Sequence, residues 1–182
     1  MQSLANYWRV QSIPSSYGSY ITESADERFD KLWDRAKSQY RIVGERSSSY
    51  LNWRYTSFKT RHYSYYCLTE KPEAELVGYI VFSVEAKNIS IADLFVADPD
   101  GKAWEHLLVG FAAQMRKEGA QSLVISYFGT AAFEQRLQRL GFFRRTRLCT
   151  LLVYSDPDLP KEFTQTVYDR ENWFLLDGEM DI

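Results

Sequence analysis

The spacing of apolar residues changes near residue 63, and this change limits the folds open to the chain. Before it, Phe29, Leu32, Trp33 and Ala36 recur every three or four residues, as on one face of an amphipathic helix. After it, apolar residues alternate or run together, as they do in strands. The three strands expected from this pattern cover residues 63–67, 76–84 and 88–97. The first half therefore predicts a helix followed by an antiparallel meander.

Helices and strands alternate in the second half of the chain. The turn-forming run Asp98-Pro99-Asp100-Gly101 ends the third strand. The elements expected after it are a helix over 104–115, a strand over 122–127, a helix over 130–140, a long strand over 142–154 and an edge strand at 173–176. Helical crossovers after a meander predict an α/β fold of the α+β type with a mixed sheet.

Length and composition favour one globular domain. The chain has 182 residues, 45% hydrophobic and 25% charged, which suits a single packed core. Residues 1–25 show no sustained period and are expected to be an arm or linker, so the domain is assigned to residues 26–182. The aromatic content of 16% is high for such a domain and is consistent with a homodimer or a tandem partner domain.

Charge and cysteine content exclude several classes of function. The formal net charge of −2 gives no basic surplus for nucleic acid. The longest apolar runs are far shorter than a membrane span needs. Cys67 and Cys149 are expected to be buried free thiols, which favours the cytoplasm, and His62 and His106 lack the spacing of metal ligands.

Three segments of the second half carry a family pattern. They are Asp93-Leu94-Phe95-Val96-Ala97-Asp98-Pro99, Arg116-Lys117-Glu118-Gly119-Ala120, and Phe133 through Leu140-Gly141-Phe142. Together with the order of elements, they resemble the GNAT acyltransferase superfamily over residues 26–154. The resemblance implies acetyl-CoA as cosubstrate and an amine as acceptor.

The resemblance also implies where the cosubstrate binds. In the family, one strand parts from its neighbour, its backbone bonds the pantetheine arm, and the next loop holds the diphosphate. In this chain the strand positions are Leu94, Phe95 and Val96, and the loop positions are Gly101, Lys102, Ala103 and Trp104. The loop departs from the family because it has one glycine, a bulky Trp104, and two acids, Asp98 and Asp100. Lys102 is a point charge that offsets those acids.

Candidate catalytic residues lie in the expected strands or at their ends, and Asp93 is expected either where the sheet parts or facing solvent. The position four residues before Gly141, often tyrosine in the family, is Leu137 here. Asp93 is the candidate general base, with an exposed or capped acid as the alternative, and Glu85 is expected to pair with Lys87. Tyr127 is the candidate for contact with thioester or acceptor, or else an ordinary strand aromatic.

The run from Arg46 to Tyr55 is the other unusual segment. A short helix is expected over residues 48–58, and its pattern resembles GNAT-like domains of bacterial surface-polysaccharide clusters. The resemblance implies that Trp53, Arg54 and Tyr55 bind a sugar or carboxylate acceptor, by stacking and forked hydrogen bonds. The alternative is that they anchor the helix to the sheet.

These features favour an acyl-CoA-dependent N-acyltransferase, with an amino sugar or cell-surface precursor as acceptor. The single-glycine loop, Trp104 and Leu137 favour a rival, a non-catalytic GNAT-fold binding module. A relative that uses charged tRNA is disfavoured by the lack of a basic surplus.

Overall fold

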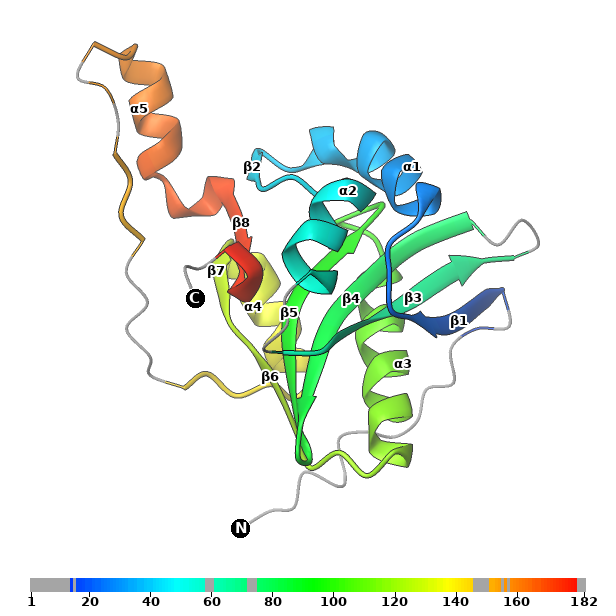
Figure 1. Cartoon of the computed structure of the whole chain (residues 1–182). Coiled ribbons are helices and arrows are strands. Elements are labelled where there is room, and N and C mark those ends of the chain that lie inside the picture. Colours follow the sequence, from blue (N-terminus) through cyan, green and yellow to red (C-terminus); the bar gives the residue numbers. More distant parts are fainter. Residues whose placement is uncertain are drawn as a thin grey trace.

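An antiparallel meander with one added parallel strand forms the main sheet (Figure 1). The computed structural model describes residues 14, 16–57, 61–71, 75–145, 151–154, 156 and 158–179. The strands, in spatial order, are β1 (Tyr17–Thr22), β3 (Tyr63–Glu70), β4 (Glu75–Glu85), β5 (Asn88–Val96) and β6 (Ser122–Ile125). The first four pair antiparallel and β6 runs parallel to β5, which confirms the predicted mixed sheet.

A second, three-stranded sheet adjoins the first. It has the order β2 (Ile42–Val43), β8 (Trp173–Leu176) and β7 (Tyr127–Gly129). The β8 segment was expected at an edge, and that prediction was wrong, because β8 is the middle strand, parallel to β2 and antiparallel to β7. Both Phe174 and Leu176 are buried in this position.

Helices cover both faces of the main sheet, and each face has its own core. One face carries α1 (Glu27–Ala36), the 3-10 turn η2 (Lys37–Gln39), α2 (Ser48–Leu51) and the π-helical turn η3 (Asn52–Thr56). The other face carries α3 (Ala103–Lys117) and α4 (Ala131–Arg139). The C-terminal part adds α5 (Lys161–Tyr168) and the 3-10 turns η4 (Arg170–Asn172) and η5 (Asp177–Glu179).

Local sequence signals set the helix boundaries. The Asp26 side chain accepts a hydrogen bond from the Arg28 backbone N–H and caps α1, and Ser47 caps α2 in the same way through Tyr50. Gly119 and Gly141 follow α3 and α4 with φ of 91° and 90°, the left-handed conformation that glycine adopts without strain. The helix ends predicted at these glycines are therefore confirmed.

Two segments differ from expectation. The strand predicted over residues 142–154 is wrong where the structure describes it, because 142–145 and 151–154 form no strand; Cys149 lies outside the described residues. The expected N-terminal arm contains β1, which pairs with β3. None of the described helices is long and apolar enough to cross a membrane.

Candidate functional site

The main sheet opens at β5. Strand β6 pairs with β5 only from Asn88 to Ile91, and its own partners end at Ile125. Beyond these residues β5 continues to Val96, whereas the segment after β6 continues as β7 and pairs with β8. The two strands therefore part in the second half of β5, as an α/β ligand site at a sheet opening requires.

The C-terminal strand β8 lies in this opening. Both β8 and η5 contact β5, and β8 pairs with β7 on one side and with β2 on the other. The Phe174 ring lies 5.0 Å from the ring of Tyr40, 5.5 Å from that of Tyr127 and 5.7 Å from that of Trp104, between centroids. Leu176 is fully buried. The opening is consequently filled by the protein's own side chains.

A buried ion cluster lies beside the opening. Arg46, 1% exposed, donates through Nε and Nη2 to one Asp93 carboxylate oxygen at 3.2 and 2.9 Å. The Tyr79 hydroxyl donates to the other Asp93 oxygen at 3.1 Å. A second carboxylate, Glu179 of η5, lies 2.5 Å from Arg46 Nη2, and the guanidinium packs over the rings of Phe95 and Phe174.

This cluster changes the interpretation of Asp93. The carboxylate is at the sheet opening, as one of the two expectations had it, but it is 2% exposed and held by two partners. In this conformation it is not free to take a proton from a substrate. Sequence analysis missed Arg46 and Glu179, since nothing in the local pattern distinguishes a buried arginine from an exposed one.

Burial raises the pKa of both carboxylates in the cluster. For Asp93, desolvation is the largest cause, opposed by the charge of Arg46 and by hydrogen bonds from Arg46 and Tyr79. For Glu179, desolvation again raises the pKa, Arg46 lowers it and the nearby Asp93 raises it. Two carboxylates share one guanidinium, so the fully ionised cluster has an excess negative charge.

This excess predicts a pH dependence of stability for Glu179. A carboxyl whose folded pKa lies above its ordinary value near 4.5 contributes its full stability below that value and loses it as pH rises through the folded pKa. We therefore expect the difference in unfolding free energy between the natural chain and Glu179→Gln to shift against the natural chain between pH 4 and pH 7. Urea unfolding at each pH measures it, with Glu162→Gln on α5 as control. A shift in favour of the natural chain would show that Arg46 outweighs burial.

The side chains of the three residues predicted to bind the acceptor lie in different environments. Trp53 is 64% exposed, with its ring 5.6 Å from that of Tyr50. Arg54 donates from Nε to the Gly178 carbonyl at 2.8 Å. Tyr55 is a core residue, edge-to-face with Tyr63. Trp53 thus faces solvent, Arg54 is half-buried and Tyr55 is buried, although all three belong to the π-helical turn η3, a conformation frequent at functional sites.

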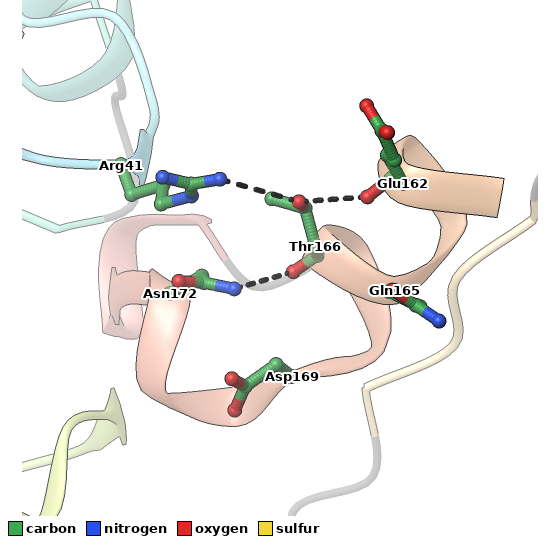
Figure 2. A pocket seen from close by; sticks show the side chains of 6 residues that line it. All are labelled: Arg41, Glu162, Gln165, Thr166, Asp169 and Asn172. Atoms are coloured by element: carbon green, nitrogen blue, oxygen red, sulfur yellow. Dashed lines mark hydrogen bonds between the residues drawn. The ribbon is translucent and has the colours of Figure 1, made fainter. Parts of the chain in front are cut away.

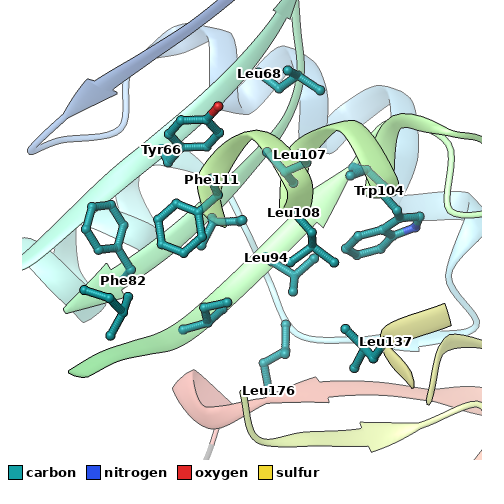
Figure 3. Packing of buried hydrophobic residues seen from close by; sticks show 14 of the residues in the cluster. Tyr66, Leu68, Phe82, Leu94, Trp104, Leu107, Leu108, Phe111, Leu137 and Leu176 are labelled. Carbon is teal, nitrogen blue, oxygen red and sulfur yellow. The ribbon is translucent and has the colours of Figure 1, made fainter. Parts of the chain in front are cut away.

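The Tyr127 hydroxyl is engaged at the start of α4. It accepts a hydrogen bond from the Thr130 backbone N–H at 2.8 Å, and the ring lies 4.7 Å from Phe133. Tyr127 is therefore part of the packing between β7 and α4. Leu137 of α4 is buried and faces the same core as Leu94 and Leu176 (Figure 3).

A polar hollow of about 420 Å³ lies elsewhere, between the start of β2 and α5 (Figure 2). Its lining residues are Arg41, Glu162, Gln165, Thr166, Asp169 and Asn172. Arg41 donates to the Thr166 hydroxyl across it at 3.5 Å. The hollow contains none of the residues that the sequence predicted for binding or catalysis.

Comparisons with known proteins identify the fold. No family model and no curated protein matches the chain. Among solved structures, the ribosomal-protein-S18-alanine N-acetyltransferase of Escherichia coli matches with a TM-score of 0.53 at 16% identity, over 71% of this chain and 80% of that one. An acetyltransferase of Trypanosoma brucei matches with 0.53 at 13%, over 75% and 99%. The aminoglycoside acetyltransferase meta-AAC0020 from a soil metagenome matches with 0.52 at 11%, over 79% and 99%.

The chain has the GNAT fold.

Within this GNAT fold, the predicted diphosphate loop is closed by its own acid. Asp98 Oδ1 accepts hydrogen bonds from the backbone N–H groups of Asp100 and Gly101, both at 3.0 Å. A Cβ at Gly101 would lie 2.4 Å from Asp98 Oδ2, so this glycine is needed for the Asp98 contact. The N–H groups suited to an anion are thus occupied by a carboxylate. Lys102 remains exposed at the start of α3.

Trp104 belongs to the core of the GNAT fold rather than to a loop surface. It is 2% exposed and lies in the cluster that Figure 3 draws with Leu108 and Leu137. Its Nε1 donates to the Pro99 carbonyl at 2.9 Å, and its ring lies 4.7 Å from that of Phe133. Arg136 donates to the same carbonyl at 2.8 Å. These contacts fix the loop before α3, and only the backbone of Trp104 is left for a ligand.

The strand positions predicted for pantetheine are also engaged. Leu94, Phe95 and Val96 are fully buried, and the Val96 carbonyl accepts a hydrogen bond from the Tyr40 hydroxyl at 3.2 Å. With β8 in place, these residues do not fit an acyl-CoA in the position that the resemblance implies. Binding there requires the loop or the C-terminal segment to move.

Proposed function

We propose that the chain is an acyl-CoA-dependent N-acyltransferase that transfers an acyl group to an amine. The proposed acyl group is acetyl. The parting of β5 from β6 after Ile91 carries this proposal, because it provides an opening at the carboxyl end of a parallel pair. Helix α3 begins directly after β5 and its loop. Its amino end suits a diphosphate once Asp98 has turned away.

The acceptor side of the proposal rests on an exposed aromatic side chain. The Trp53 ring is 64% exposed and lies 5.6 Å from the ring of half-buried Tyr50, a pair that suits stacking on a sugar ring. We accordingly propose an amino sugar or a cell-surface precursor as acceptor. Asp93 stays the proposed base and Tyr127 the proposed contact with the substrate, each of them after a change of hydrogen-bond partner.

We also propose the cytoplasm as the compartment. Cys67 is fully buried, and burial raises the pKa of its thiol to about 12, so the sulfur is an inert apolar group. A free buried cysteine suits a reducing environment.

Titration with acetyl-CoA tests the proposal, and a second titration of the Asp98→Ala variant tests where the diphosphate binds. Removing the carboxylate frees the N–H groups of Asp100 and Gly101 and eliminates its repulsion of phosphate oxygens. We expect isothermal titration to show saturable binding to the natural chain and about tenfold tighter binding to Asp98→Ala, equivalent to about 1.4 kcal/mol. Asp34→Ala, an acid removed from the surface of α1, is the matched control.

A second candidate is a non-catalytic GNAT-fold binding module. The observation that favours it is the filling of the opening by β8 and Trp104. The ring of Phe174 on β8 lies 5.7 Å from the ring of Trp104, between centroids. Absence of binding heat at millimolar acetyl-CoA, for both the natural chain and Asp98→Ala, would select this candidate over the transferase.

A further inference from the structure

The η5 turn lies against two arginines. Its Glu179 carboxylate meets Arg46 at 2.5 Å, and its Gly178 carbonyl accepts a hydrogen bond from Arg54 at 2.8 Å. The other Glu179 oxygen accepts from the Leu176 backbone N–H at 2.7 Å. A carboxylate and the preceding peptide carbonyl are thus recognised together, by charged donors, beside the opening at β5.

Arg46 keeps a charge partner when Glu179 leaves. Asp93 still accepts from Nε and Nη2, and the Gly44 carbonyl accepts from Nη1 at 2.8 Å. Glu179 is the second carboxylate on one cation, and its burial is unfavourable enough to raise its pKa. Its departure returns a carboxylate to water without leaving an unpaired buried charge. Glu179 is therefore the exchangeable member of the cluster.

The space at Gly178 has a defined shape. A Cβ at this position would lie 1.8 Å from the Tyr55 hydroxyl oxygen and 3.2 Å from the Ala92 carbonyl. Only a flat, unbranched group fits there. The same helical turn that provides Tyr55 and Arg54 also carries the exposed ring of Trp53, so this space is next to the proposed acceptor surface.

We propose that Arg46 and Arg54 form a binding site for an acceptor that carries a carboxylate and an amide carbonyl, and that η5 occupies this site as an internal ligand. The chemical class is a peptide segment that contains an N-acylated acidic residue and carries the free amine for acyl transfer elsewhere in the same molecule. Glu179 and Gly178 present these two groups, and an external ligand displaces them while β8 stays packed. The inference rests on the proposed acyl transfer for the role of acceptor, but the binding itself requires no acyl-CoA.

The test uses N-acetyl-L-glutamic acid α-amide, which has both groups, and the neutral N-acetyl-L-glutamine α-amide as its match. The full-length Glu179→Ala variant removes the internal carboxylate. We expect the acidic probe to raise the melting temperature of Glu179→Ala in proportion to the logarithm of its concentration, and the neutral probe to have no effect. The natural chain should need at least about tenfold more acidic probe than Glu179→Ala for the same rise in melting temperature, because its own Glu179 competes for the site. Glu162→Ala on α5 is the control and should behave as the natural chain.

Hydrogen exchange separates ligand binding from simple repair of a structural ion pair. In the natural chain, displacement of Glu179 frees the Leu176 N–H, so saturating acidic probe should accelerate exchange at this amide while the amides of β4 stay protected. In Glu179→Ala, adding Arg54→Met should weaken binding of the acidic probe about tenfold, because the carbonyl contact is lost.

Equal responses to the acidic and neutral probes in folded Glu179→Ala would overturn the proposal. So would binding to the natural chain with unchanged exchange at Leu176. No arm of the experiment contains acyl-CoA. A failed acetyl-CoA titration together with acid-selective binding would therefore reject the transferase and keep the site, and the opposite pair of results would reject the site alone.

Discussion

Replacing Arg46 with methionine is expected to lower the unfolding free energy by about 3–5 kcal/mol, because a buried ion cluster then loses its cation. The change leaves Asp93 and Glu179 buried without a cation, and at pH 7 both carboxylates then pay their desolvation cost. Urea unfolding at pH 7 measures the loss. Arg41→Met is the matched control, because Arg41 is an exposed arginine nearby, and it should change stability by less than about 0.5 kcal/mol.

A triple variant separates unpaired charge from lost packing. In Arg46→Met combined with Asp93→Leu and Glu179→Leu, all three charged side chains of the cluster are apolar, and buried ion networks replaced in this way often retain their stability. We expect the triple variant to recover most of the loss seen with Arg46→Met alone. Equal destabilisation in both variants would contradict the charge explanation and would assign the effect to packing of the Arg46 side chain against Phe95 and Phe174.

Phe174→Ala is expected to cost about 3–5 kcal/mol, the range for a large aromatic residue removed from a core. The ring meets those of Tyr40, Trp104, Tyr127 and Phe133, so its loss leaves a cavity in the opening beside β5. Thermal and urea unfolding measure the change. Phe163→Ala on α5, where the ring is 53% exposed, is the control and should stay within about 0.5 kcal/mol.

The same variant tests whether β8 is a structural part of the sheet opening. A loss below about 1 kcal/mol, with the rest of the chain still cooperatively folded, would show that β8 is only loosely held. The opening would then be accessible without displacement, and the acyl-CoA fit would have to be judged for a chain with β8 released.

Local signals were sufficient for much of the fold. The period of Phe29, Leu32 and Ala36 predicted α1, and alternation predicted β3 to β5, because side chains repeat every 3.6 residues on a helix and every two on a strand. Glycines at φ near 90° ended α3 and α4 as predicted. These features depend only on neighbours in the sequence.

The candidate site was predicted in part. The structure places Asp93 at the sheet opening and Trp53 exposed on η3, whereas their roles in catalysis and acceptor binding stay predictions. The partners of Asp93 were missed, since Arg46 lies 47 positions and Glu179 86 positions from it in the chain. Trp104 was assigned to the loop for the same reason, because its aromatic partner Phe174 is 70 positions away.

The sequence by itself determined α1, the order of elements from β3 to α4, the mixed sheet and the ends of α3 and α4, because hydrophobic period, capping residues and glycine conformation act over a few residues. Only the tertiary structure decided what fills the opening at β5. The pairing of β8 with β7 and β2, and of Glu179 with Arg46, joins segments more than 40 residues apart. Such contacts form where packing and charge balance are best across the whole chain, and no local pattern specifies them.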